Sequence, residues 1–175
     1  MVVEFITDRK IYEKVICEAI PSATTFVWLA TSDLKDLYME KGRKKMVPFL
    51  ETLSDLLIKG VQVRLIHAKE PGSAFQADFD RYPELARGLE RLLCPRIHFK
   101  SVVVDGKFAY SGSANLTGAG MGAKSESRRN FESGFITSDK NLIHQIAEQF
   151  DDLWMGKFCK ACQRKRFCSN SSEMM

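Results

Sequence analysis

A histidine, a lysine and a group of small polar residues lie close together between residues 97 and 118. His98 and Lys100 are two residues apart in an extended apolar run, so both side chains should leave a strand on the same side. The second run of this stretch ends in Gly112, Ser113 and Asn115, where backbone N–H groups and short polar side chains can converge on an anion. Together these groups predict a phosphate site that contains a nucleophile.

Asp105 and Gly106 separate the two runs. An Asp-Gly pair is a strong signal for a two-residue hairpin turn, because both turn positions need a positive φ. We therefore expect an antiparallel hairpin in which Asp105 acts first as a turn residue. The hairpin would bring the His98 end of the first run beside the Ser113 end of the second.

The spacing His-x-Lys, four residues, Asp, six residues and Gly-Ser-x-Asn resembles the HKD signature of the phospholipase D superfamily. The resemblance implies an α/β fold that cleaves phosphodiesters and needs no metal ion or other cofactor for catalysis. The positions of the signature are filled here by His98, Lys100, Asp105, Gly112, Ser113 and Asn115.

The resemblance also implies a role for each side chain. His98 would attack phosphorus to give a phosphohistidine, and Lys100, Ser113 and Asn115 would hold the phosphate oxygens. Glu132 is similar to the carboxylate that many family members place on the next strand to orient the histidine. The alternative for Glu132 is that it simply faces solvent.

Members of this family build an active site from two motifs, and only one is complete here. His67-Ala68-Lys69 is also His-x-Lys, but the rest of the signature does not follow it. The resemblance therefore implies a homodimer with one site across a two-fold axis. In that arrangement one His98 is the nucleophile and the other protonates the leaving group and then activates water.

The hydrophobic patterns around the hairpin predict the elements that position it. A helical pattern between two β-branched, apolar runs indicates a β-α-β unit and hence parallel strands. The fold class is therefore α/β, a mixed, largely parallel sheet flanked by helices. We expect helices at 11–20, 46–59, 84–93 and 142–154, strands at 24–31, 61–67 and 130–137, a loop at 69–78, a catalytic domain over 1–156 and a basic, cysteine-containing tail over 157–175.

The tail contains three of the five cysteines, in the pattern C-x2-C-x5-C formed by Cys159, Cys162 and Cys168. Two closely spaced thiolates can hold Zn²⁺, which prefers four ligands. Cys94 is the best candidate for the fourth ligand, His144 is the second, and a water or a ligand from another chain is the third. The pattern indicates a structural zinc knuckle, and the alternative is a tail of reduced thiols without metal.

The net charge of +4 is concentrated in two basic clusters. The alternative to polyanion binding is that each cluster is a solvated surface. No long apolar run and no signal-peptide pattern are present, so we expect a cytoplasmic chain that does not associate with membranes. The clusters consist of Lys41, Arg43, Lys44 and Lys45, and of Lys157, Lys160, Arg164, Lys165 and Arg166.

Three functions fit these observations. The first is an endonuclease that cleaves DNA or RNA, which is favoured by the basic clusters and by the absence of a membrane-binding stretch. The second is a phospholipase D or cardiolipin-type hydrolase, which should have an apolar rim at the mouth of the site. The third, a non-catalytic nucleic-acid-binding module, is disfavoured because every residue of the signature is intact.

Overall fold

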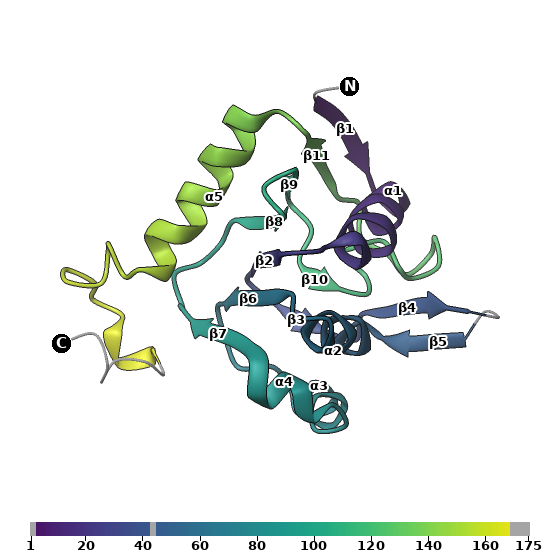
Figure 1. Cartoon of the computed structure of the whole chain (residues 1–175), viewed down its shortest axis with the longest axis horizontal. Helices are drawn as coiled ribbons and strands as arrows, with labels where there is room; N and C mark the ends of the chain where they lie inside the picture. Colours follow the sequence, from purple (N-terminus) through teal and green to yellow (C-terminus); the bar gives the residue numbers. More distant parts are fainter. Residues whose placement is uncertain (1–2, 43–44, 169–175) are drawn as a thin grey trace.

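The computed structural model describes residues 3–42 and 45–168. In this part of the chain the main element is a seven-stranded mixed sheet with helices on both faces, in the strand order β1-β11-β9-β8-β2-β6-β7 (Figure 1). Its strands are β1 (Val3–Thr7), β2 (Phe26–Thr31), β6 (Gln62–His67), β7 (Leu89–Leu93), β8 (Lys100–Val104), β9 (Phe108–Gly112) and β11 (Ser133–Thr137).

Pairing in the sheet changes direction at β2. Strands β2, β6 and β7 run parallel, as the β-α-β pattern indicates. Strand β8 is antiparallel to β2, and the pairs β8–β9, β9–β11 and β11–β1 are also antiparallel. The mixed α/β class is thus confirmed, but parallel pairing is confined to one half of the sheet because the hairpin and β1 extend the other half.

The helices cover the two faces unequally. Val27 and Leu29 of β2 belong to the larger core, under the first helical segment and α2. Trp28 packs on the opposite face, under α5. The helical elements are α1 (Arg9–Ile11), η1 (Tyr12–Ala19), η2 (Ile20–Ser22), α2 (Phe49–Ile58), α3 (Ser73–Phe79), α4 (Pro83–Gly88), α5 (Lys140–Trp154) and η3 (Lys165–Phe167), and the small two-stranded sheets are β3 (Leu34–Lys35) with β10 (Leu116–Thr117) and β4 (Tyr38–Lys41) with β5 (Lys45–Pro48).

Several predicted elements differ from the observed ones. The helix expected at 84–93 ends at Gly88, and Leu89–Leu93 forms β7. Tertiary pairing explains this change, because the open edge of β6 accepts a parallel strand and Arg64 binds Glu90 across it at 3.0 Å. The helix expected at 46–59 begins only after Pro48, α3 lies in the predicted loop, and β1 was not predicted.

The described residues contain no helix that is long and apolar enough to cross a membrane. Two residues of the first basic cluster, Arg43 and Lys44, lie outside the described ranges, as does the end of the tail from residue 169. The division into a catalytic domain and a tail stays a prediction.

The hairpin between β8 and β9 has a slightly longer turn than predicted. Asp105 and Gly106 have φ values of 52° and 63°, and the N–H of Lys107 donates to the carbonyl of Val104 at 2.9 Å. The ladder pairs Val104 with Phe108, so the loop contains three residues instead of two. Both central residues are thus left-handed, as the Asp-Gly pair requires.

Asp105 also fixes the start of β2. Its carboxylate accepts from the N–H groups of Thr24, Thr25 and Phe26 at 2.8–2.9 Å and from the Thr24 hydroxyl at 2.8 Å. Burial alone would raise the pKa of Asp105, but these donors, first the Phe26 N–H, bring it below its usual value. The carboxylate therefore joins the hairpin turn to the neighbouring strand.

Asp105→Asn should lower the free energy of unfolding at neutral pH by about 2 kcal/mol, because a charged acceptor of several hydrogen bonds is lost. A carboxyl with a depressed folded-state pKa contributes stability above its unfolded pKa of about 4, and this contribution is lost as pH falls through the lower, folded value. Denaturant unfolding between pH 7 and pH 2 should therefore show a smaller decrease in the free energy of unfolding for the variant than for the unaltered chain.

The exposed carboxylate of Asp80 provides the control. Asp80→Asn should leave the decrease in the free energy of unfolding between pH 7 and pH 2 as it is in the unaltered chain. An Asp105→Asn protein with the acid profile of the unaltered chain would contradict the role of the carboxylate.

Candidate functional site

The candidate site lies along the edge of the large sheet that is formed by the ends of its strands, where β2 and β9 end and β8 and β11 begin. The register pairs Ala30 near the end of β2 with Ser101, and Lys100 at the start of β8 with Gly112 at the end of β9. Gly112 also pairs with Gly134 of β11. The residues that precede β8 and β11 and follow β2 and β9 are therefore brought to the same edge.

His98 and Lys100 occupy different environments at this edge. His98 is exposed and lies two residues before β8, so it is not held by the ladder. Lys100 is the first residue of β8 and only 6% exposed, and its ammonium group donates to the carbonyl oxygen of His98. Burial lowers the pKa of Lys100 from its usual value, and the nearby Glu132 carboxylate acts in the opposite direction. The buried Lys100 ammonium thus contacts the backbone of the residue that carries the accessible imidazole.

Glu132 lies directly before β11 and has polar partners. The Ser113 hydroxyl donates to one carboxylate oxygen, and the Asn130 amide donates to the other at 3.0 Å. The backbone of Glu132 exchanges two hydrogen bonds with Asp8, at 2.9 and 3.0 Å. Ser113 in turn accepts from the N–H of Ser133 at 3.1 Å. Glu132 is therefore half-buried and held in place rather than simply facing solvent.

Asn115 is anchored from the end of β2. Its amide oxygen accepts from the N–H of Ser32 at 3.1 Å and lies 3.2 Å from the Thr31 hydroxyl. The Ser32 hydroxyl donates to the carbonyl of Ile97 at 3.3 Å, next to His98. Since the amide oxygen is engaged by the protein, the group that Asn115 can offer to a phosphate is its NH₂.

Three residues that hold the candidate site side chains in place were not predicted from the sequence. Asp8, Thr31 and Asn130 hold Glu132 or Asn115, yet none of them belongs to the signature. A positive φ of 48° at Asp8 marks the sharp turn after β1, but its partner is 124 residues away in the sequence. No local pattern could have predicted that contact.

Two further candidate residues, Asp105 and His144, lie away from this edge, and a third, His67, lies at it but is buried. Asp105 lies at the opposite end of β8, where it binds the start of β2. His67 is buried, and its Nδ1 lies 2.8 Å from the carbonyl of Lys69. Burial lowers the pKa of His67, which favours a neutral, structural ring. His144 is exposed on α5, as its position off the apolar stripe predicts.

The cysteines of the predicted zinc knuckle, Cys94, Cys159, Cys162 and Cys168, are all partly buried free thiols. Burial raises the pKa of the Cys168 thiol, and Cys94, Cys162 and Cys159 raise it further. Four thiols are a donor set that suits zinc. Within residues 3–42 and 45–168, however, no three His, Cys, Asp or Glu side chains are arranged to hold a metal ion. The zinc site stays a prediction.

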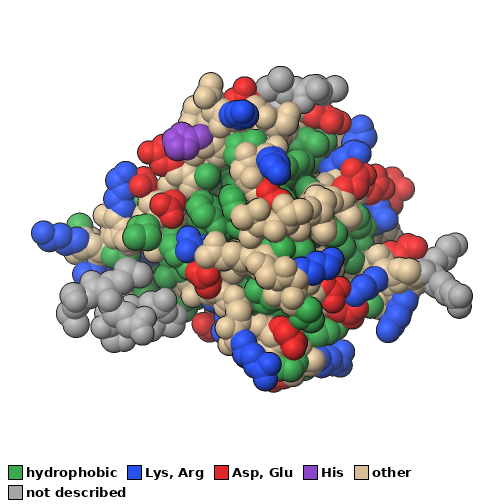
Figure 2. Space-filling view, viewed as in Figure 1, with side chains coloured by type: hydrophobic (Ala, Val, Ile, Leu, Met, Phe, Trp, Pro, Cys, Tyr) green, Lys and Arg blue, Asp and Glu red, His purple; other side chains and the backbone are tan. Residues whose placement is uncertain are grey.

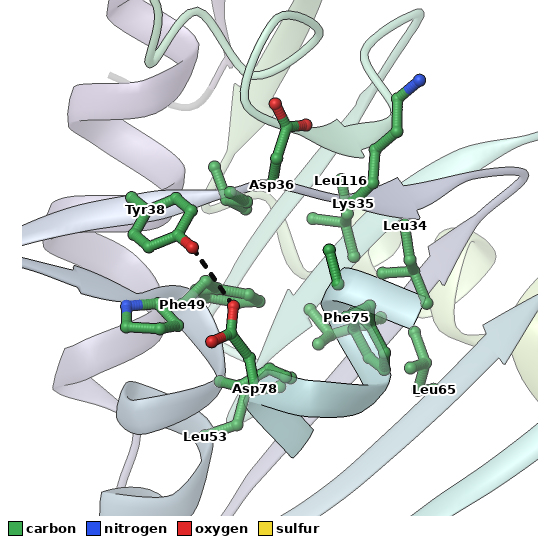
Figure 3. A pocket seen from close by; sticks show the side chains of 15 residues that line it. Leu34, Lys35, Asp36, Tyr38, Phe49, Leu53, Leu65, Phe75, Asp78 and Leu116 are labelled. Atoms are coloured by element: carbon green, nitrogen blue, oxygen red, sulfur yellow. Dashed lines mark hydrogen bonds between the residues drawn. The ribbon is translucent and has the colours of Figure 1, made fainter. Parts of the chain in front are cut away.

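A small apolar pocket lies behind the site. It has a volume of about 50 Å³ and is lined by side chains of β3, β4, α2 and α3, among them Phe49 and Phe75 (Figure 3). The Tyr38 hydroxyl donates to Asp78 at 3.2 Å across its mouth. Leu116, next to Asn115, lines the pocket, but His98 does not. The pocket is therefore a packing feature beneath the site.

Comparisons with known proteins relate the chain to one family. The family model described as "Cardiolipin synthase, PLD-like domain" matches residues 16–154. A mitochondrial cardiolipin hydrolase from Chlamydomonas reinhardtii is 28% identical over 109 residues. That match covers 59% of this chain and 46% of the hydrolase, so the chain spans about half the length of this relative.

Two solved structures have a similar fold. Nuc from Salmonella typhimurium, a phospholipase D family member, superposes with a TM-score of 0.63 at 19% identity, covering 87% of this chain and 93% of Nuc. NucT from Helicobacter pylori has a TM-score of 0.61 at 17% identity, covering 87% of this chain and 97% of NucT. At these identities the likeness shows the fold alone.

The glycines at the edge are required by packing. A Cβ at Gly112 would lie 2.5 Å from the carbonyl oxygen of Ser133, and one at Gly134 would lie 2.6 Å from the ring of Tyr110. Tyr110 is fully buried beside both glycines, and burial raises its pKa to about 12 although the Ala114 N–H lowers it. The signature glycine therefore lets β9 and β11 approach under a tyrosine ring.

Gly112→Ala should lower the free energy of unfolding by about 1–3 kcal/mol, because the added methyl group overpacks this contact. Denaturant unfolding measures the loss. Gly72→Ala is the matched control, since no atom lies within 4 Å of its Cβ and its φ is ordinary. Equal effects of the two substitutions would contradict the packing explanation.

Proposed function

Because the chain belongs to the PLD-like domain family, we propose that it is a phosphodiesterase that cleaves DNA or RNA through a covalent intermediate on His98. One observation carries the proposal. The exposed His98 lies at the same sheet edge as the buried Lys100 ammonium and the Ser113–Glu132 pair. A nucleophile, a cation for phosphate oxygens and an oriented carboxylate are the groups that this reaction needs.

In the first step an imidazole nitrogen of His98 attacks phosphorus, and the bond from phosphorus to the leaving oxygen breaks. Lys100, Ser113 and the NH₂ of Asn115 stabilise the charge on the phosphoryl oxygens. The leaving oxygen takes a proton from a second imidazolium. Glu132 orients the phosphate-binding side chain of Ser113, whose hydroxyl donates a hydrogen bond to it.

In the second step water replaces the histidine. The second imidazole, now neutral, removes a proton from water, and the resulting hydroxide attacks phosphorus. The bond between phosphorus and His98 breaks, and the free imidazole returns to its starting state. The cycle leaves one phosphomonoester and one hydroxyl, and neither step requires a metal ion.

A second copy of the chain supplies the second histidine in this proposal. One chain offers one complete signature. Of its other two histidines, His67 ends β6 beside Thr31 but is only 2% exposed, and His144 is on α5. Two copies related by a two-fold axis through the edge would bring two His98 side chains together. In this proposal Asp105 supports the fold of each half-site, and zinc at the cysteines would have a structural role.

A phospholipid substrate is the second candidate. Phe131, directly before Glu132, is 97% exposed. An exposed ring next to the site provides part of the apolar rim that a lipid-cleaving enzyme should have. The relative from Chlamydomonas reinhardtii carries the name of a cardiolipin hydrolase. The net charge of +4 and the basic cluster after α5 favour nucleic acid as the first candidate.

His98→Ala should abolish cleavage of labelled DNA or RNA, with a loss of at least about a thousandfold, because the covalent route is removed. The unaltered chain should cleave in excess chelator and sediment as a dimer. Parallel reactions with labelled DNA, RNA and phospholipid vesicles identify the substrate class.

His144→Ala removes an exposed imidazole from α5 and is the matched control, which should cleave at the normal rate. Turnover of phospholipid alone would rule out the nuclease and favour the second candidate. Cleavage by His98→Ala at the normal rate would rule out the mechanism, and a fully active monomer would rule out the shared site.

A further inference from the structure

The segment after α5 returns to the catalytic edge of the sheet. Residues 156–168 leave the end of α5 and lie beside β7 (Figure 1). The Arg164 guanidinium donates to the carbonyl oxygen of Pro95 at 3.2 Å. Pro95 belongs to the connection between β7 and β8 and is three residues before His98. The C-terminal segment therefore contacts the same short connection that carries the proposed nucleophile.

The segment itself is folded into turns. Within the segment, consecutive turns are closed by hydrogen bonds such as that from the N–H of Cys162 to the carbonyl of Cys159 at 3.1 Å. The folded segment is thus held against the connection by Arg164.

The segment is basic over its whole described length. It contains no acidic residue. Lys157 pairs with Asp152 of α5 at 2.6 Å, whereas Lys160, Lys165 and Arg166 are exposed, as is Arg96 on the adjoining connection. Basic side chains project at the left of Figure 2, where Figure 1 places the segment. This charge favours a polyanion.

Two exposed aromatic rings lie next to these charges in the segment. Phe158 is 49% exposed and Phe167 is 52% exposed. The Lys157 ammonium lies 5.8 Å from the centre of the Phe158 ring, and the Arg166 guanidinium lies 4.6 Å from that of Phe167. Proteins bind single strands of nucleic acid with this combination, because cations contact the phosphates and aromatic rings stack on unpaired bases. A duplex keeps its bases stacked inside and offers no such partner to the rings.

We propose that residues 156–168, together with Arg96, bind single-stranded nucleic acid and extend the substrate path from His98 along the connection between β7 and β8. This inference deepens the proposed nuclease function and rests on it. A membrane surface is a weaker fit, because the segment consists of turns and the short helix η3 and has no amphipathic helix to lie in the interface.

The test measures binding by fluorescence anisotropy with the full chain, in chelator, on a labelled oligothymidylate of about 20 nucleotides. All proteins carry His98→Ala so that the probe is not cleaved. The double substitution Lys165→Ala and Arg166→Ala should weaken binding about tenfold at low salt. It should also reduce the slope of log K against log salt by about 1.4, since each phosphate contact on a single strand contributes about 0.7. Phe167→Ala should weaken binding about tenfold through lost stacking.

Matched controls lie at the opposite edge of the sheet. The double substitution Lys59→Ala and Lys107→Ala removes the same charge, and Ile58→Ala removes an apolar side chain that is 66% exposed. Both should bind within about twofold of the parent. If the control double substitution weakens binding as much as Lys165→Ala with Arg166→Ala, the attraction is non-specific and the proposal is overturned. Unchanged binding in the segment variants would overturn it too, as would a preference for a duplex of the same length or for anionic vesicles.

Hydrolysis of bis(p-nitrophenyl) phosphate by the unaltered chain tests the chemistry separately. If the chain hydrolyses this small diester but binds the oligonucleotide independently of the segment, the binding surface is wrong and the proposed phosphodiesterase chemistry stands. If binding depends on the segment but neither the small diester nor nucleic acid is cleaved, the surface is supported and the proposed function is wrong.

Discussion

The register across three strands determines where the candidate catalytic groups lie. Lys100 of β8 pairs with Gly112 of β9, which pairs with Gly134 of β11. His98 is two residues before Lys100, and Glu132 is two residues before Gly134. Ser113 directly follows Gly112, so this row of pairs places all three side chains at one edge. A slip of one residue would turn Lys100 to the other face of the sheet. The absence of a Cβ at both glycines keeps this register under the ring of Tyr110.

Burial of Lys100 is the second constraint. A buried ammonium is unfavourable unless it is paired or hydrogen-bonded. Here the carbonyl of His98 accepts a hydrogen bond from it, and the nearby Glu132 opposes the decrease in its pKa. In the proposed reaction a phosphate oxygen would be a further partner of the Lys100 ammonium. The buried ammonium would therefore stabilise the negative charge that develops on the phosphoryl oxygens in the transition state.

The sequence predicted the hairpin better than the sheet around it. The HKD-like spacing is local, so it predicted the hairpin and the candidate residues within it, and Asp105 could be recognised as a turn residue. Other features depend on contacts between distant residues. Leu89–Leu93 has helical spacing but becomes β7 because β6 offers an edge, and Asp8 binds Glu132 across the chain. Glu132 itself was predicted from the resemblance, but its partners Ser113 and Asn130 appear only in the fold.

The most direct test of this account is to trap the covalent intermediate. The unaltered chain would be mixed with a labelled oligonucleotide and quenched in alkaline denaturant within milliseconds, because phosphohistidine survives in base. Mass spectrometry would then locate the adduct. The account predicts a phosphoryl adduct on His98 that forms and decays at the rate of turnover. Turnover without an adduct, or with an adduct on another residue, would contradict it.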